Sequence, residues 1–273
     1  MTASMVSEGG GAPAGGQSGG VENPERAPEE LLAGSVAIVT GAGRGIGRGI
    51  ALEMVRAGAD VVLLSRTLTE LEAVAAEIRA LGRRALPVVA DVRDAAQVVA
   101  AVKKAWEAFP SIDILVNNAG LLMFSKFWEY DEATYRDIID TNLTGPFLLC
   151  QVVADYWISR GTPGRIINIA SVETEVAYPD QAPYAASKGG LLTLTKVLAK
   201  ELGPAGIRVA ALGPGPIDTP MSQRFKAQSE VGVVFGRLGQ TSEVGQAAVF
   251  LASQMASFVT GTIVYVDGGY LLR

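Results

Sequence analysis

From residue 31 onward, short apolar runs alternate with longer stretches in which apolar residues recur at helical spacing. The apolar runs predict seven strands, at residues 36–39, 61–64, 85–90, 114–116, 165–170, 207–212 and 263–266. The helical stretches between them are 47–57, 67–82, 94–109, 131–159, 183–202 and 242–253. Strands without polar alternation are buried on both faces, as in a parallel sheet covered by helices. The pattern therefore predicts an α/β fold with a doubly wound parallel sheet.

Residues near the ends of these helices refine the prediction. Thr67 and Glu70 have the spacing of a capping box, and Asp94 is a favoured N-cap residue. The pair Gly145-Pro146 lies inside the stretch over 131–159 and predicts that this helix is bent or split there.

The first 29 residues do not share this pattern. They are rich in Gly, Pro, Ser and Glu and contain almost no bulky apolar residues. Such a segment cannot bury enough apolar surface to offset the entropy lost on ordering, so we expect a disordered tail over 1–29 and one domain over 30–273. The tail lacks the apolar stretch of a secretory signal, and no apolar run reaches the roughly 18 residues of a membrane-spanning helix. We therefore expect neither secretion nor a membrane partner.

Composition narrows the chemistry further. The formal net charge of −5 argues against a nucleic-acid partner. The chain has no histidine, which excludes histidine-based triads, proton shuttles and metal sites, and we expect no bound metal. Cys150 is the single cysteine, so no intrachain disulfide can form and a reducing, cytoplasmic location is expected. Acid–base chemistry must therefore use Tyr, Lys, Asp, Glu or Cys.

One constellation offers such chemistry. Tyr184 and Lys188 are four residues apart and share one face of a predicted helix, and Ser171 precedes Tyr184 by thirteen residues. A cation beside a phenol favours the phenolate and lowers the tyrosine pKa, so the phenol can act as a general acid or base. A serine can hold the substrate oxygen beside it. The alternative is an amphipathic helix in which Tyr184 packs and Lys188 is solvated.

A glycine-rich loop follows the first predicted strand. Gly41, Gly45 and Gly47 have the spacing G-x-x-x-G-x-G, and Arg44 and Ile46 lie between them. Glycines allow a tight turn and a close approach of the backbone to a pyrophosphate, and the next helix offers its N-terminal amides to the anion. The order strand, loop, helix predicts dinucleotide binding rather than an ordinary turn.

The end of the second predicted strand indicates which dinucleotide is bound. Enzymes that use NAD place Asp or Glu there to bind the ribose 2′-hydroxyl, whereas an arginine accommodates the 2′-phosphate of NADP. This chain has Ser65, Arg66 and Thr67 at that point, and Arg44 adds a second positive charge. We therefore favour NADP(H) over NAD(H). The alternative is that Arg66 is a solvated side chain at a strand end.

Polar residues also follow the third and fourth predicted strands, at the edge where an open parallel sheet forms its ligand crevice. Asp91, which precedes Val92, is placed to accept a hydrogen bond from an adenine amino group, and Asn117-Asn118 ends the fourth strand. Asn142 lies in the long predicted helix, where the alternative is a polar side chain that bonds to its own backbone.

Together these motifs resemble the short-chain dehydrogenase/reductase family over residues 31–271, with further matches at Pro214-Gly215-Pro216-Ile217-Asp218-Thr219 and Asp267-Gly268-Gly269. The resemblance implies a single-domain Rossmann fold with a seven-stranded parallel sheet. It also implies a catalytic tetrad, which falls on Asn142, Ser171, Tyr184 and Lys188. With the residues discussed above, the expected cofactor-binding set is Gly41, Arg44, Gly45, Ile46, Gly47, Ser65, Arg66, Asp91, Val92, Asn118, Tyr184, Lys188, Pro214, Ile217 and Thr219.

The resemblance also implies a role for each member of the tetrad. Tyr184 would exchange a proton with the substrate oxygen, and Ser171 would orient that oxygen. Lys188 would lower the pKa of Tyr184 and hold the nicotinamide ribose, and Asn142 would hold a water that connects Lys188 to solvent. The expected activity is the NADP(H)-dependent interconversion of a secondary alcohol and a ketone by hydride transfer.

The substrate is less well defined by the sequence. Ser171-Val172 and the run over 184–190 resemble the family's glucose and gluconate dehydrogenases, and the carboxylates of Glu173 and Glu175 suit a sugar or polyol. The alternative is that both glutamates are rim residues in water. The segment over 219–237 is short for a substrate lid and predicts an open cleft.

Two other functions stay open. A 3-oxoacyl-[acyl-carrier-protein] reductase is the second candidate, although the negative net charge offers no obvious docking surface for that acidic partner. A non-catalytic dinucleotide-binding regulator is a candidate of another class, and the intact tetrad counts against it.

A homotetramer is expected on similar grounds. The runs over 147–153 and 191–198 are apolar over more of their surface than one core-facing side needs, and the end of the chain, 269–273, is apolar as well. The family pairs the corresponding helices across a twofold axis, and a second interface at the chain end would complete a tetramer.

Overall fold

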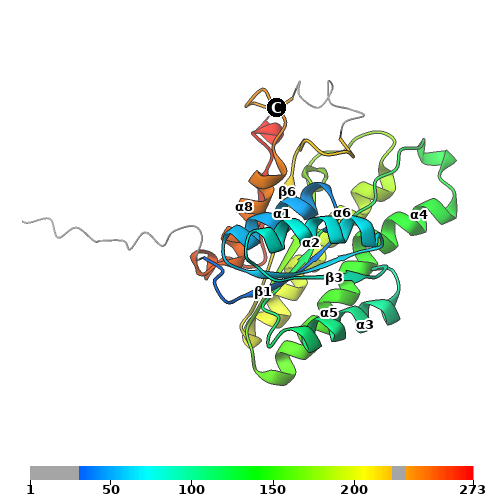
Figure 1. Cartoon of the computed structure of the whole chain (residues 1–273). Coiled ribbons are helices and arrows are strands. Elements are labelled where there is room, and N and C mark those ends of the chain that lie inside the picture. Colours follow the sequence, from blue (N-terminus) through cyan, green and yellow to red (C-terminus); the bar gives the residue numbers. More distant parts are fainter. Residues whose placement is uncertain (1–30, 223–231, 273) are drawn as a thin grey trace, which may run out of the picture.

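The structure is a computed structural model that describes residues 31–222 and 232–272 (Figure 1). The tail expected over 1–29 lies outside these residues, and so do residues 223–231 of the expected lid segment over 219–237. Among the helices that are described, none is long and apolar enough to cross a membrane.

Seven parallel strands form one sheet in the order β3-β2-β1-β4-β5-β6-β7. The strands are β1 (Val36–Thr40), β2 (Asp60–Ser65), β3 (Ala85–Val89), β4 (Ile114–Asn117), β5 (Gly164–Ile169), β6 (Ile207–Pro214) and β7 (Ile263–Val266). The seven strands expected from the apolar runs are confirmed, within two residues at either end. The chain first builds outward from β1 to β3 and then returns to β4 on the other side of β1, so the crevice between β1 and β4 is the expected ligand site.

Helices cover both faces of the sheet (Figure 1). They are α1 (Gly45–Arg56), α2 (Leu68–Ala80), α3 (Ala95–Ala108), α4 (Glu132–Ile139), α5 (Gly145–Arg160), α6 (Ala182–Leu202) and α8 (Thr241–Ala252). Alternate residues of β1 belong to opposite cores: Ala37 and Val39 pack with α1, α2 and α8, whereas Val36 and Ile38 pack with α3, α5 and α6. This burial on both faces explains why the strands lack polar alternation.

The helix ends confirm one predicted cap and correct another. The Asp94 side chain accepts hydrogen bonds from the backbone N–H groups of Ala96 and Gln97, as an N-cap should. The capping box at Thr67 and Glu70 is wrong, because the Thr67 side chain makes no cap and the Glu70 carboxylate instead faces Arg44.

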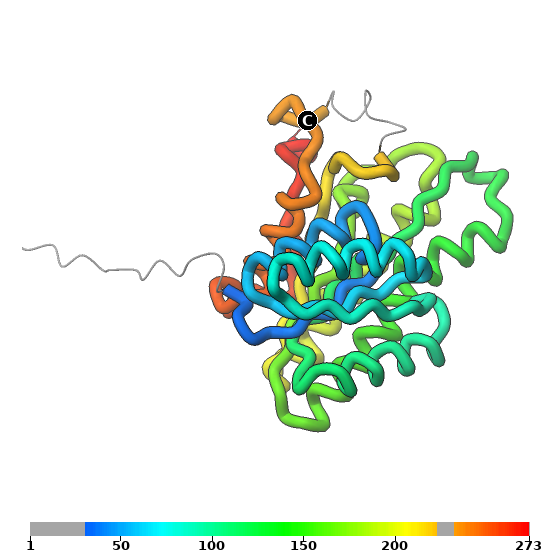
Figure 2. The backbone as a smooth tube through the Cα atoms, viewed as in Figure 1, coloured from blue at the N-terminus to red at the C-terminus, as the bar shows by residue number. Residues whose placement is uncertain are grey.

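The long predicted helix over 131–159 is divided into α4 and α5 by a π-helical turn at Asp140–Thr144. The interruption therefore precedes Gly145-Pro146, and the proline occupies the first turn of α5, where its missing N–H is tolerated. At the other end of the sheet, the segment after residue 231 runs beside the last described residues, with the Phe235 N–H donating to the carbonyl of Gly268 at 3.2 Å (Figure 2).

Candidate active site

The loop between β1 and α1 needs glycine at several positions, of which Gly41 and Gly47 show the reason best. Gly41 has a φ of +63°, a left-handed conformation that other residues rarely adopt. A Cβ at Gly47 would lie 2.3 Å from the carbonyl oxygen of Gly41, so the first turn of α1 rests directly on the loop. The exposed Arg44 and the half-buried Ile46 complete this turn. The loop thus presents bare backbone at the N-terminus of α1, as an anion site requires.

The glycine-rich loop is fastened to the end of β4. The Thr40 hydroxyl accepts hydrogen bonds from the backbone N–H groups of Asn118 and Ala119, both at 2.9 Å. In return, the Asn118 side chain donates to the carbonyl of Thr40 at 2.9 Å. These bonds fix the spacing between the end of β1 and the end of β4, where Asn118 lies.

Asp91 and Val92 follow β3 at the same edge of the sheet. Arg93 binds the Asp91 carboxylate through Nε at 3.0 Å and Nη2 at 2.7 Å, and this hydrogen bonding holds the Asp91 pKa below its usual value. Asp91 is therefore a charged, fixed acceptor. Val92 is buried against Gly145, where a Cβ would lie 2.8 Å from its methyl group. The sequence did not predict that Arg93 binds the Asp91 carboxylate, because no spacing rule shows that the Arg93 side chain turns back toward a residue two positions earlier.

Two arginines lie near Asp91 and the glycine-rich loop. The Arg66 side chain is 67% exposed, and its Nη1 is 3.9 Å from Oδ2 of Asp91. The Arg44 side chain is 74% exposed, and its Nη1 is 3.4 Å from Oε1 of Glu70. Both guanidinium groups can therefore reach an anion at this end of the crevice.

Glu70 is a second residue that the sequence reading missed. A Cβ at Gly43 would lie 2.9 Å from Oε2 of Glu70 and 3.5 Å from the hydroxyl of Ser65, so these two side chains meet beside the loop. An acidic side chain therefore does lie beside the loop, but it comes from the first turn of α2 and not from the end of β2. The sequence prediction compared only the residues at the end of the strand and could not find it.

Ser171, Tyr184 and Lys188 come together where β5 ends and α6 begins. The Ser171 hydroxyl lies beside Tyr184 and lowers the pKa of its phenol. Lys188 lies one turn further along α6, with its Nζ 5.5 Å from the centre of the tyrosine ring. The same Nζ donates to the carbonyl of Ile169 at 2.7 Å, and Lys188 is only 4% exposed. An acid–base group, an orienting hydroxyl and a buried cation thus share one site.

Burial dominates the proton affinities of this site. Burial raises the pKa of Tyr184, the charge of Glu173 raises it further, and the hydrogen bond with Ser171 lowers it. Burial also lowers the pKa of Lys188 to about 8, against the opposing effect of Glu173. The expected lowering of the Tyr184 pKa is therefore wrong for this structure, because a half-buried phenolate loses part of its solvation and lies near the Glu173 carboxylate.

Asn142 lies in the π-helical turn and is fully buried. Its Oδ1 accepts from the backbone N–H of Leu121 at 2.7 Å, and its Nδ2 donates to the carbonyl of Leu121 at 2.9 Å and to the Ser187 hydroxyl at 3.0 Å. The side chain thus joins the segment after β4 to α6, next to Lys188. These partners exclude the alternative in which Asn142 bonds to its own helix.

The segment after β6 crosses the glycine-rich loop. β6 ends at Pro214, and Ile217 forms a single β-bridge with Gly239. The Thr219 methyl group lies 3.8 Å from the position of a Cβ at Gly45, whereas the Ile217 side chain is buried in the core. Thr219 therefore faces the loop, and Ile217 anchors the segment that carries it.

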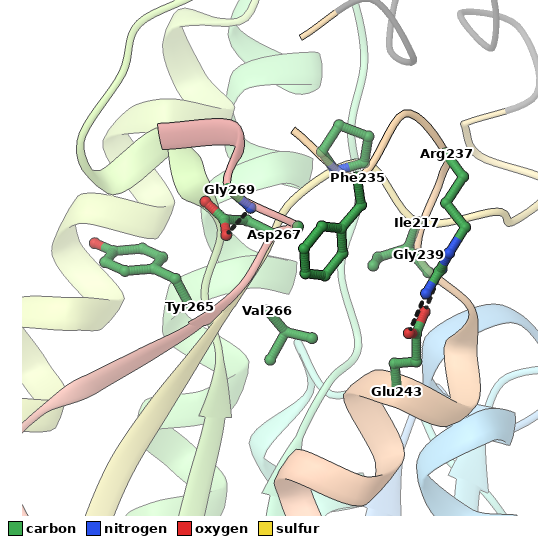
Figure 3. A pocket seen from close by; sticks show the side chains of 11 residues that line it. Ile217, Phe235, Arg237, Gly239, Glu243, Tyr265, Val266, Asp267 and Gly269 are labelled. Atoms are coloured by element: carbon green, nitrogen blue, oxygen red, sulfur yellow. Dashed lines mark hydrogen bonds and ion pairs between the residues drawn. The ribbon is translucent and has the colours of Figure 1, made fainter. Parts of the chain in front are cut away.

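A cavity of about 330 Å³ is lined in part by this segment (Figure 3). The ring of Phe235 stands over it, and an ion pair between Arg237 and Glu243 at 2.7 Å borders it. Among the described residues that line it, none belongs to the tetrad. The cavity is thus a neighbour of the reaction site and not the site itself.

The last described residues brace the wall beside Ser171. The Tyr178 hydroxyl donates to the Tyr270 hydroxyl at 2.6 Å, and the hydroxyls of Thr174 and Tyr265 are 2.9 Å apart. Tyr270 is 7% exposed and packs within its own subunit, whereas Leu272 is 83% exposed. Only part of the apolar chain end is therefore free for an interface.

Known proteins share this fold and much of this sequence. A family model described as enoyl-(acyl carrier protein) reductase matches residues 41–271. Gluconate 5-dehydrogenase of Gluconobacter oxydans is 39% identical over 244 residues, which cover 87% of this chain and 95% of that protein. The 3-oxoacyl-[acyl-carrier-protein] reductase FabG of Staphylococcus aureus is also 39% identical, over 85% of this chain and 96% of that protein.

Solved structures agree with the sequence matches. A short-chain dehydrogenase/reductase from Mycobacterium marinum superposes with a TM-score of 0.87 at 34% identity, over 90% of this chain and 98% of that one. A gluconate 5-dehydrogenase from Burkholderia cenocepacia in complex with NADP and tartrate gives 0.85 at 36% identity, with the same coverage. The chain therefore belongs to the short-chain dehydrogenase/reductase family of NAD(P)-dependent oxidoreductases.

Proposed function

We propose that the protein interconverts a secondary alcohol and a ketone with NADP(H), and that Tyr184 is the acid–base group. The observation that carries the proposal is the single site in which Tyr184 lies beside both the Ser171 hydroxyl and the buried Lys188. This arrangement holds a proton donor and a second hydroxyl where one substrate oxygen can meet both.

The protein's own groups would handle the proton and the orientation of the substrate. A bound nicotinamide would supply or take the hydride. In reduction, the Ser171 hydroxyl would donate a hydrogen bond to the carbonyl oxygen while Tyr184 transfers its proton to it. Burial raises the pKa of Tyr184 and keeps the phenol protonated at neutral pH, which suits this direction. Lys188 and Asn142 would hold the geometry of α6 around the reacting groups.

NADP(H) is favoured by the positive charge at one end of the crevice. Arg66 and Arg44 are both exposed, and each can turn from its carboxylate partner toward a 2′-phosphate. The solved gluconate 5-dehydrogenase from Burkholderia cenocepacia is a complex with NADP, which supports the same choice. Glu70 opposes it, because the carboxylate already neutralises part of the Arg44 charge.

A sugar or polyol substrate is supported by the gluconate 5-dehydrogenase relatives and by two glutamates after Ser171. The 3-oxoacyl-[acyl-carrier-protein] reductase remains the second candidate, because FabG of Staphylococcus aureus is equally identical. Steady-state turnover with NADPH and NADP⁺ is measured on one panel of ketones, sugars, polyols and a 3-oxoacyl thioester. The substrate that is turned over distinguishes a sugar or polyol dehydrogenase from a 3-oxoacyl-[acyl-carrier-protein] reductase. Turnover of none of them would favour the non-catalytic regulator.

We also propose a cytoplasmic homotetramer. Exposed apolar side chains on α5 and α6, among them Phe147 and Val197 at 46% each, support pairing of these helices with a second copy. Sedimentation equilibrium should give a tetramer, and Phe147→Glu should reduce its size by placing a charge in the interface. A wild-type monomer at micromolar concentration would refute the assembly.

A further inference from the structure

The two glutamates after Ser171 have different surroundings. Glu175 is exposed, and its Oε1 accepts a hydrogen bond from the Tyr265 hydroxyl at 2.7 Å. Glu173 is half-buried, and its Oε2 is enclosed by protein without a hydrogen-bond partner among the described residues. The sequence alone could not show which of the two carboxylates faces the reaction site and which lies in water, because both follow Ser171 closely.

Glu173 lies against the reacting groups. Its backbone N–H donates to the Ser171 hydroxyl at 3.1 Å, and its carboxyl interacts electrostatically with Tyr184 and Lys188 from α6. Among the described residues, the charge of Glu173 also acts on Tyr130, from the segment between β4 and α4, and raises its pKa. Burial raises the pKa of Glu173 to about 7, with Lys188 opposing. A carboxyl thus stands at the reaction site with one oxygen unused.

A buried polar atom without a partner is rare in folded proteins and needs an explanation. Neither neighbouring donor reaches it in this structure: Lys188 donates to the carbonyl of Ile169, and the Tyr130 hydroxyl donates to the carbonyl of Met123 at 2.7 Å. A substrate oxygen bound between Ser171 and Tyr184 would bring its own substituents next to Glu173. A hydroxyl on the adjacent carbon would supply the missing donor.

We propose that Glu173 is a substrate-binding residue that accepts a hydrogen bond from a hydroxyl next to the reacting carbon, so that the substrate class is a vicinal diol and its α-hydroxy ketone. This assignment rests on the proposed alcohol–ketone activity and selects among its substrates. A 3-oxoacyl thioester has no hydroxyl beside its ketone and would leave Glu173 unpaired, so the assignment favours sugars and polyols.

The test compares 3-hydroxy-2-butanone with 2-butanone, which differ only in the hydroxyl. Glu173→Leu should lower the ratio of kcat/KM for the hydroxy ketone to kcat/KM for 2-butanone by roughly 10- to 150-fold, the range for losing a hydrogen bond to a charged group, and any effect on Tyr184 that both substrates share cancels in this ratio. Glu173→Gln keeps an acceptor and should restore part of the preference. Glu175→Leu is the matched control and should leave the ratio of the two substrates as in the wild type.

Two results would overturn the assignment: an unchanged ratio in Glu173→Leu, or an equal change in Glu175→Leu. If the wild type reduces neither ketone, turnover on the wider panel decides the proposed function, and calorimetry decides the role of Glu173. In that measurement 2,3-butanediol is titrated into protein containing NADP⁺. Binding that is weaker in Glu173→Leu than in the wild type supports the assignment, and equal binding refutes it.

Discussion

Arg66 is the position at which the preference for NADPH can be tested most directly. Replacing it by Arg66→Ala removes a side chain that is 67% exposed and 3.9 Å from the Asp91 carboxylate. A charge-assisted hydrogen bond to a phosphate is worth ~1.5–3 kcal/mol. Because solvent and salt screen an exposed pair, we place this contact at ~1.5 kcal/mol, which is roughly tenfold in kcat/KM for NADPH. NADH has no 2′-phosphate, so its kcat/KM should stay close to the wild-type value.

Initial rates with NADPH and NADH at low ionic strength measure this ratio. Glu70→Gln should move it the other way, since it releases Arg44 from an ion pair that is 3.4 Å long, and an exposed pair of this kind is worth up to ~1 kcal/mol, or about fivefold. Arg79→Ala, which also removes an exposed arginine paired with a glutamate on α2, is the charge control. An equal loss of kcat/KM with both cofactors in Arg66→Ala would show that Arg66 does not contact the 2′-phosphate.

Three further results are expected at the reaction site. Tyr184→Phe should lower kcat by at least ~100-fold, the usual contribution of a general acid, while NADPH binding followed by fluorescence stays near the wild-type value; substantial residual kcat would contradict the proposed role. Glu173→Gln removes a negative charge that raises the pKa of Tyr184, so the rise of kcat/KM for alcohol oxidation with pH should move to lower pH, and an unmoved profile would show that the two groups are not coupled. Burial raises the pKa of the Cys150 thiol to about 12, so mass spectrometry should detect alkylation only after unfolding, and labelling of the native protein would contradict its burial.

The sheet was predictable because its inner strands are buried on both faces. Val36 to Val39, for example, alternate between two cores, so every position must be apolar and the run stands out in the sequence. The helix ends were less predictable, because they depend on partners from other elements. Glu70 has the spacing of a capping residue, yet Arg44 on another loop attracts its carboxylate.

The candidate site shows the same limit. Glycine spacing placed the loop between β1 and α1, and the pair Tyr184 and Lys188 was recognisable from helical spacing alone. Their proton affinities were not, because burial and the charge of Glu173 outweigh the one interaction visible in the sequence. The π-helical turn that carries Asn142 was also out of reach, since no local signal marks the extra residue of such a turn.

The strand order has a consequence for how such a protein can be re-engineered. Groups that surround the proposed 2′-phosphate position, such as Arg44, Arg66 and Glu70, all precede β4 in the chain, whereas Ser171, Tyr184 and the residues beside them all follow it. The two halves meet along the β1–β4 pairing, through the bonds between Thr40 and Asn118, and where α1 packs against α8. A chimera joined just before β4 would therefore exchange the preference for NADPH or NADH between two relatives and leave each with its own substrate, provided that these contacts between the halves are kept.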